Sequence, residues 1–177
     1  MFNSVRIAVN SEKYELLIKQ YKNKIYGYAY YMLKNRMDAD DITQEVFIRI
    51  WKNIDKFNLS SAKPWIMKTT HNLCIDYLRK NQVSTQRQKD IEETVILTDE
   101  EIVYKKNQLK ERIRNGIESL PENLRSIFIL YELQGFKYNE ISKALDLPLN
   151  TVKVYLMRAR KKLQEELSDT DHNVKRI

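Results

Sequence analysis

Apolar side chains return along this chain at the spacing of helices. Residues 11–34 predict one long helix, because an apolar residue recurs every third or fourth position. The positions in question are Tyr14, Leu17, Ile18, Tyr21, Ile25, Tyr28 and Met32. Tyrosines also stand at positions 26, 28, 30 and 31. They allow two interpretations, stacking on nucleic-acid bases or packing in the core, and packing is favoured because half-buried aromatics are ordinary.

A second helix is predicted over residues 38–53. Asp38 is expected to cap it, and Asp40 and Asp41 suit the positive end of the helix dipole. One apolar stripe comprises Ile42, Val46, Ile50 and Ile54, and a neighbouring stripe comprises Phe47 and Trp51. A helix that is apolar over so wide an arc either lies deep in a bundle or presents one face to another protein.

A polar loop around Phe57 occupies residues 55–63, and Pro64 then predicts the first turn of a third helix that ends near Gln82. This helix is expected to bury Trp65, Ile66, Leu73 and Tyr77. Its opposite side is expected to carry His71, Asn72, Asp76, Arg79 and Lys80. His71 and Cys74 are three positions apart, but two ligands do not make the four-ligand set of structural zinc. We therefore expect no metal and no cofactor.

Beyond residue 83 the helical pattern fades. Residues 90–101 carry six acids and no base, which predicts an acidic linker with a short apolar anchor at residues 95–97. A further helix is expected over residues 101–117, and the tail after Leu167 is expected to fray.

Residues 120–163 predict three short helices, of which the last two form a helix-turn-helix. Gly135 breaks the first helix from the second, and residues 146–148 form the turn. The final helix has one buried stripe: Val152, Leu156, Ala159 and Leu163. Its other side carries Lys153, Arg158, Lys161 and Lys162, with no acid between positions 151 and 162. Such a helix suits the major groove of DNA, where cations neutralise phosphates, although a charged surface helix is also common in proteins that bind no DNA.

The amino-acid composition narrows the fold classes and the kinds of partner that remain. Only 3 Gly and 3 Pro in 177 residues disfavour turn-rich β folds, so the fold class is all-α. The formal net charge of +7 suits a polyanionic partner. The single cysteine excludes an internal disulfide, and no stretch approaches the ~20 apolar residues of a membrane span. We expect a cytoplasmic protein with no membrane insertion.

The C-terminal run resembles region 4 of bacterial RNA polymerase sigma factors of the extracytoplasmic-function group. The resemblance is carried by Leu120-Pro121, Gly135, Glu140-Ile141, Thr151-Val152-Lys153 and the run from Arg158 to Leu163. Lys137 stands where a serine or threonine cap is usual, and Asp146 replaces the common turn glycine. Asn150, Val154, Tyr155 and Met157 also depart from the commoner residues at groove-facing positions, so the promoter sequence does not carry over.

The first three helices resemble region 2 of the same family. The resemblance implies that the second helix docks on the β′ clamp helices of core polymerase through Asp41, Gln44, Glu45, Phe47, Ile48 and Trp51. It also implies that the third helix and the loop before it contact the minus-10 promoter element and trap a flipped base. The residues implied there are Phe57, Asn58, His71, Asn72, Asp76, Arg79 and Lys80. For the minus-35 element the implied residues are Asn150, Thr151, Lys153, Val154, Tyr155, Arg158 and Lys161.

The resemblance therefore implies two small helical domains joined by a linker, with a helix-turn-helix in the second. The boundaries are residues 10–83 for region 2, 84–104 for the acidic linker and 105–168 for region 4. The linker is either solvated or threaded through the RNA channel of polymerase. Expected partners are core polymerase, through its β′ clamp helices and β flap, promoter DNA and an anti-sigma factor.

No nucleophile–base pair, phosphate-binding loop or carboxylate pair predicts an enzyme. The leading hypothesis is thus a dissociable promoter-specificity subunit of RNA polymerase. A stand-alone helix-turn-helix regulator would not need the apolar, acid-edged face of residues 40–51, and a helical adaptor would not need an acid-free recognition helix.

Overall fold

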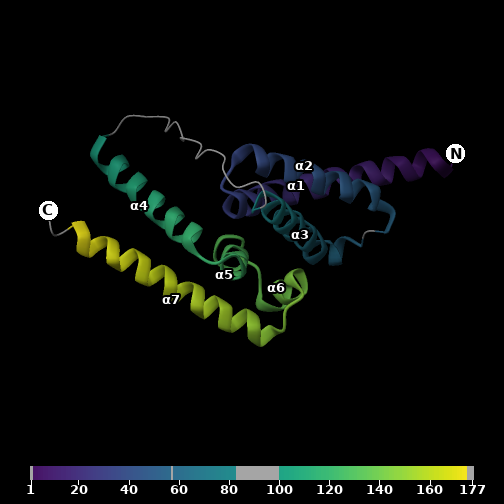
Figure 1. Cartoon of the computed structure of the whole chain (residues 1–177). Coiled ribbons are helices and arrows are strands. Elements are labelled where there is room, and N and C mark those ends of the chain that lie inside the picture. Colours follow the sequence, from purple (N-terminus) through teal and green to yellow (C-terminus); the bar gives the residue numbers. More distant parts are fainter. Residues whose placement is uncertain (1, 57, 83–99, 175–177) are drawn as a thin grey trace.

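A computed structural model describes residues 2–56, 58–82 and 100–174 of the chain (Figure 1). Throughout these residues the fold is helical, which confirms the all-α prediction. The α-helices are α1 (Phe2–Leu33), α2 (Arg36–Lys52), α3 (Ala62–Gln82), α4 (Glu100–Ser119), α5 (Glu122–Phe128), α6 (Tyr138–Leu145) and α7 (Leu149–Val174). The single turns are η1 (Ile54–Lys56), η2 (Leu59–Ser61) and η3 (Ile129–Leu133), of which η3 is a π-helical turn.

The turn between α1 and α2 differs from its prediction in its cap. Asn35 caps α2, because its side-chain oxygen accepts a hydrogen bond from the backbone N–H of Asp38 at 3.0 Å. The predicted cap, Asp38, instead lies in the first turn of the helix. Lys34 adopts a left-handed conformation (φ 61°) and closes α1 by donating its N–H to the carbonyl of Tyr30. At its other end α1 begins at Phe2 rather than near Ser11, since residues 2–11 contain neither Gly nor Pro to stop the helix.

Helices α1, α2 and α3 pack around one apolar core. The predicted stripes of α1 and α2 are buried there, including Ile25, Tyr28, Val46 and Ile50. In α3 the predicted face was partly wrong, because Trp65 is 37% exposed. The buried face comprises Ala62, Ile66, Met67, Thr70 and Cys74. A threonine fits this face because Thr70 Oγ1 donates to the carbonyl of Ile66 at 2.8 Å, which satisfies its hydroxyl within the helix.

The helix-turn-helix forms as predicted. Gly135 separates η3 from α6 with φ +67°, and Asp146 ends α6 in the left-handed conformation with φ 57°. Asp146 thus fills the role of the usual turn glycine, as its side chain predicts. At the start of α6, Lys137 offers no side-chain cap, but Glu140 accepts the N–H of Lys137 at 2.8 Å. Helix α7 buries Val152, Leu156 and Ala159.

Helix α7 continues to Val174 instead of fraying after Leu167. Again no Gly or Pro stops it, and α4 lies alongside it in the opposite direction (Figure 1). The close approach of the two helices depends on Gly116. A Cβ added there would stand 2.5 Å from Cδ1 of Leu163, so any larger residue displaces that leucine.

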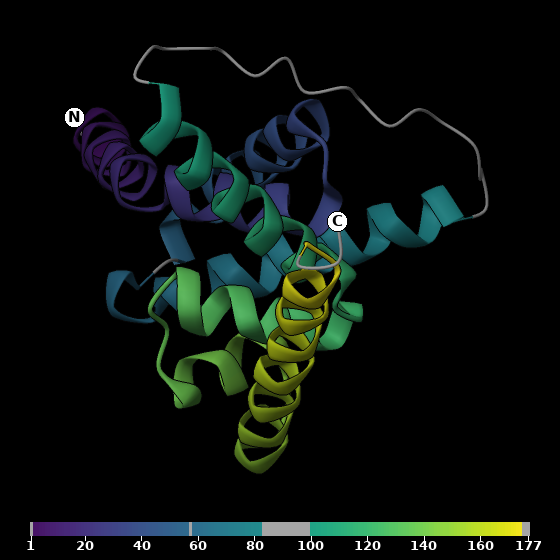
Figure 2. The same cartoon turned by 90° about the vertical axis from the view of Figure 1, so that its left-hand side faces the viewer.

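The two helical regions predicted as separate domains pack directly against each other. The buried core runs without a break from α1–α3 into α5–α7, and Figure 2 shows α5 and α6 beside α1 and α3. The apolar anchor and most of the acidic segment predicted between them fall within residues 83–99, which lie outside the described residues. The last two acids of that segment, Glu100 and Glu101, belong to α4, so the helix begins before the predicted end of the linker at residue 104.

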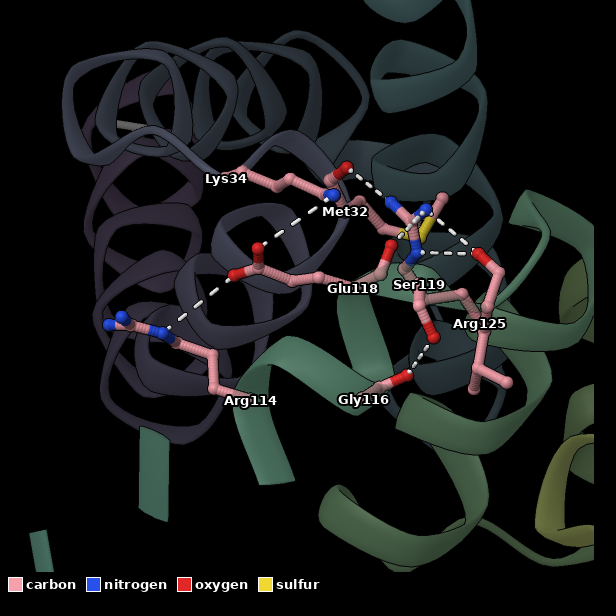
Figure 3. A network of polar contacts seen from close by, with 8 residues as sticks. Met32, Lys34, Arg114, Gly116, Glu118, Ser119 and Arg125 are labelled. Atoms are coloured by element: carbon pink, nitrogen blue, oxygen red, sulfur yellow. Dashed lines mark hydrogen bonds and ion pairs between the residues drawn. The ribbon is translucent and has the colours of Figure 1, made fainter. Parts of the chain in front are cut away.

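Arg125 joins the two regions at a helix end. Its guanidinium donates to the backbone carbonyls of Met32 (3.2 Å), Glu118 (3.0 Å) and Leu120 (2.8 Å), as Figure 3 shows. The last two carbonyls lie at the C-terminal end of α4, where helices leave acceptors unsatisfied and favour a cation. Glu118 also pairs with Lys34 across the interface at 3.7 Å.

A second inter-region contact joins α3 to α6. Lys63 Nζ lies 2.8 Å from both carboxylate oxygens of Glu140 and 4.0 Å from the centre of the Phe136 ring. Phe136 is buried, and the side-chain amide of Gln134 donates to the carbonyl of Lys24 at 3.2 Å. These contacts hold η3 and α6 against region 2.

Candidate nucleic-acid and polymerase interfaces

The outer face of α7 carries the residues predicted for the minus-35 element. Asn150, Lys153, Val154, Arg158 and Lys161 are all exposed. The preceding turn and the buried stripe of α7 hold this face outward, since residues four and seven positions apart share a helix side. It therefore offers both cations and uncharged side chains to a partner.

Two predicted residues of α7 lie at the edge of this face. Thr151 is half-buried, and Tyr155 is half-buried and packs against the hydrophobic core. Met157, which the sequence placed at a groove-facing position but not among the predicted minus-35 contacts, is 62% exposed and lies three positions after Val154. Helical spacing from Val154 was the signal that locates it on the outer face.

Arg160, although basic, belongs to the internal structure of region 4. Its Nε and Nη2 lie 2.7 and 2.6 Å from Glu132 Oε1, and its guanidinium lies 5.4 Å from the centre of the Tyr131 ring. The hydrogen bond with Glu132 raises the pKa of Arg160 above its usual value. This pair fixes the rotation of α7 relative to η3 and so determines which side chains point outward.

One side of α3 presents the residues predicted for the minus-10 element. Asn72, Asp76, Arg79 and Lys80 are all exposed. Asp76 and Arg79 approach to 3.6 Å, an exposed i,i+3 pair that contributes only a few tenths of a kcal/mol. Both side chains can therefore leave this contact at little cost.

His71 differs from its neighbours because it belongs partly to the core. Its Nδ1 lies 2.8 Å from the hydroxyl of buried Tyr28, and burial lowers the pKa of His71 to about 4. Burial also raises the pKa of Tyr28 well above its usual value, so both partners of this hydrogen bond are uncharged at neutral pH. Uncharged at neutral pH, His71 does not neutralise a phosphate, and only its other ring nitrogen is left for a base.

The loop before α3 is described only in part. Phe57 lies outside the described residues, whereas Asn58 is exposed and its carbonyl accepts from Ser61 Oγ at 3.2 Å. The neighbouring Leu59 is also exposed. The described part of the loop is thus a tight turn with an apolar side chain at its surface.

The polymerase-docking face predicted on α2 divides into exposed and buried residues. Asp41 and Gln44 are exposed, and Glu45 pairs with Arg49 at 2.8 Å. Ile48 and Trp51 are each 45% exposed, a large apolar area for a surface helix. The Trp51 ring lies 5.0 Å from that of Tyr14, which holds it in place.

Phe47, predicted to anchor the same face, is only 8% exposed and packs edge-on against Tyr14 at 6.2 Å. Phe47 and Trp51 both pack against the ring of Tyr14, whereas the accessible apolar surface belongs to Ile48 and Trp51.

Neither a metal centre nor a reactive thiol emerges from the described part of the chain. There, His, Cys, Asp and Glu side chains do not gather in groups of three or more. Cys74 is buried, and burial raises the pKa of its thiol, so it stays protonated. None of the described helices combines the length and apolarity needed to cross a membrane.

Both regions match known families. The family described as Sigma-70 region 2 matches residues 17–83, and Sigma-70, region 4, matches residues 110–163. Among curated proteins, the ECF RNA polymerase sigma factor SigW of Bacillus subtilis is 32% identical over 165 residues, which cover 86% of this chain and 88% of SigW. SigX of the same organism is 29% identical over an alignment that covers 93% of this chain and 92% of SigX. SigE of Mycolicibacterium smegmatis is 28% identical, covering 86% of this chain and 60% of that longer protein.

Solved structures show the same fold. RpoE of Bartonella quintana, solved with the anti-sigma factor NepR, superimposes with a TM-score of 0.69 at 20% identity and covers 89% of this chain and 98% of that one. CnrH, solved with the cytosolic domain of CnrY, gives 0.65 at 19% identity and covers 88% of each chain. With two regions matched in order and a relative above 30% identity over most of its length, the chain belongs to the extracytoplasmic-function sigma factors, the non-catalytic subunits that direct RNA polymerase to specific promoters.

Proposed function

We propose that three exposed faces divide the work of this sigma factor. The outer face of α2 around Ile48 and Trp51 docks on the β′ clamp helices, α3 reads and opens the minus-10 element, and α7 reads the minus-35 element. The observation that supports this division is that each of these helices turns one stripe into a shared core and keeps an opposite, chemically distinct face in solvent.

The three faces differ in the way their tasks require. The α2 face is apolar with acids at its edge, which suits a protein surface carrying cations. The α7 face is cationic and suits duplex phosphates. The α3 face mixes an amide, a carboxylate and two cations at Asn72, Asp76, Arg79 and Lys80, and such groups hydrogen-bond the edges of exposed bases. Extruding a base costs a few kcal/mol, which these contacts offset.

Reading both elements at once requires the two regions to separate. The elements lie about 25 base pairs apart, or about 85 Å along B-form DNA at 3.4 Å per base pair. In the packed structure α3, α6 and α7 are successive neighbours, so their outer faces lie within about 40 Å, a few helix diameters. The packed arrangement is therefore that of the protein when it is not bound to its promoter. In the promoter complex, polymerase holds the two regions apart.

An anti-sigma factor is the natural partner of the packed form. NepR and CnrY were each solved bound to a protein of this fold. We infer that this chain has such a partner and that the β flap of polymerase takes region 4 when the regions separate.

Run-off transcription with purified core polymerase tests the proposal. We expect promoter-specific transcript only when this protein is added, and Trp51→Ala to abolish it by weakening docking. Leu16→Ala is the matched control, because Leu16 is an exposed apolar residue on α1 (58% against 45% for Trp51) that lies outside all three faces. A protein that shifts duplex DNA alone but gives no transcript with core polymerase would instead be a stand-alone regulator.

A further inference from the structure

We propose that Val154 and Met157 read the 5-methyl groups of thymines in the minus-35 element. The inference rests on the proposed docking of α7 in the major groove and goes beyond it by naming the group that is recognised. Its starting point is a pair of exposed apolar side chains in the middle of a cationic surface.

The pair occupies the outermost line of α7. The buried stripe of Val152, Leu156 and Ala159 fixes which side of the helix faces the core, since all three are at most 1% exposed. At 3.6 residues per turn, the line directly opposite that stripe comprises Asn150, Val154, Met157 and Lys161. When α7 enters a groove, the middle of this line therefore faces the floor of the groove, and the two apolar residues stand there.

The cations lie beside this line rather than on its middle. Lys153 and Arg158 flank the outermost line on its two sides, which is where the phosphate-bearing walls of a groove would meet the helix. Contacts to phosphates position a protein without reading sequence. Sequence must then be read mainly by the central side chains, and two of these neither donate nor accept a strong hydrogen bond.

Only one group on the floor of the major groove is apolar. Thymine exposes its C5-methyl there, whereas the other bases present hydrogen-bond donors and acceptors. Val154 is 39% exposed and Met157 is 62% exposed, so both have apolar area to bury against a methyl group. Against a G·C pair the same side chains would displace water from the polar atoms of the bases without replacing its hydrogen bonds. That loss disfavours a G·C pair at this position.

The surrounding charge favours DNA over an apolar protein partner at this face. A protein that covered Val154 and Met157 would also have to cover Lys153 and Arg158, which stand within four positions of Val154. A groove between two lines of phosphates places those cations in favourable surroundings.

Replacing thymine by uracil tests the proposal, because the exchange removes the methyl group and leaves base pairing intact. The assay measures the affinity of holoenzyme for a promoter that supports run-off transcription, with each thymine of the minus-35 element replaced in turn. We expect about fourfold weaker binding at each contacted thymine, the size of one buried methyl group. Val154→Ala and Met157→Ala should each lower the thymine–uracil ratio toward one, and Lys153→Ala should weaken both duplexes equally while keeping the ratio.

The proposal is overturned if wild-type holoenzyme binds thymine and uracil promoters equally, or if the ratio survives in both alanine variants. A minus-35 element without any A·T pair also overturns it. In each of these cases run-off transcription persists, so the proposed function stands. Loss of run-off transcription on the unmodified promoter overturns the proposed function and, with it, the proposed recognition of thymine methyl groups. Because both side chains are exposed, urea unfolding of the variants should match that of the wild type and confirm that the fold is intact.

Discussion

The ion pair between Lys63 and Glu140 offers a direct way to loosen the packing of region 2 on region 4. The two residues lie 77 positions apart in the sequence, on α3 and α6, and meet at 2.8 Å. Replacing Lys63 with glutamate sets two carboxylates against each other and removes a cation from the Phe136 ring. We expect Lys63→Glu to shift the protein from the packed toward the separated arrangement.

The size of the shift follows from the exposure of the pair. The side chains are 25% and 30% exposed, so solvent screens the pair only in part and its contribution lies near the upper end of surface ion pairs, about 1 kcal/mol. The contact with the Phe136 ring adds about 0.5–1 kcal/mol. Lys63→Ala therefore costs about 1.5–2 kcal/mol, and repulsion in Lys63→Glu brings the loss to about 2–3 kcal/mol. At 1.4 kcal/mol per factor of ten, the packed population falls about 30- to 140-fold relative to the separated one.

Small-angle scattering and urea unfolding measure the effect. The radius of gyration should rise and the unfolding midpoint should fall in Lys63→Glu. The matched control is Lys68→Glu, because Lys68 also lies on α3 and pairs with region 4 at Asp146, but at 3.4 Å and with Asp146 85% exposed. We expect that control to change the stability by less than about 0.5 kcal/mol.

A charge-swapped double variant separates the pair from each residue alone. Glu140→Lys also removes the acceptor for the Lys137 N–H, so only the coupling energy of the cycle reports the ion pair. A coupling energy near zero, or equal radii of gyration for the Lys63→Glu and Lys68→Glu variants, would refute the inter-region role of this contact.

Three further predictions concern the separate faces. Trp51→Ala should weaken binding to core polymerase by more than about 2 kcal/mol and cost only about 1 kcal/mol of stability through the lost Tyr14 contact, whereas Phe47→Ala should cost about 3 kcal/mol of stability; pull-downs and urea unfolding measure the two effects. Lys153→Ala should weaken binding to all DNA sequences alike and flatten the salt slope by about one unit in titrations. His71 should titrate near pH 4 by NMR, in a His172→Gln variant that leaves a single imidazole signal. Because the pKa of His71 is lowered from 6.5, up to about 3 kcal/mol of stability should be lost as pH falls from 6.5 to 4.

Each of these predictions has an outcome that contradicts it. Equal stability losses for Trp51→Ala and Phe47→Ala would mean that Trp51 is structural. A salt slope unchanged by Lys153→Ala would remove its phosphate contact. An imidazole that titrates near pH 6.5 would show that His71 is neither buried nor hydrogen-bonded to Tyr28.

Local sequence patterns predicted the parts of the fold that depend on neighbours in the chain. The buried stripe of α7 and the left-handed turn at Asp146 both follow from residues within one or two helical turns. Errors arose where a side chain satisfied itself locally. Thr70 looked polar but donates to its own helix, so the buried face of α3 was misplaced and Trp65 was wrongly assigned to it.

Periodicity does not show contacts between distant segments. The hydrogen bond between Tyr28 and His71, that of Arg125 to the carbonyl of Met32 and the pair of Lys63 with Glu140 all join residues more than 40 positions apart. Each is a polar contact that depends on the angle at which two helices cross. The apolar stripe of one helix does not determine that angle. For this reason the sequence predicted two helical domains in their order along the chain but not how they pack against each other.

Permanganate footprinting of unpaired thymines in the promoter complex tests the central claim most directly, namely that α3 opens the minus-10 element while α7 holds the minus-35 element. Holoenzyme containing the wild-type chain should expose thymines at the minus-10 element. With Asn72→Ala and Arg79→Ala combined, the upstream element should stay protected from nuclease while the permanganate signal is lost. A permanganate signal of wild-type strength in that double variant would contradict the assignment of promoter opening to α3.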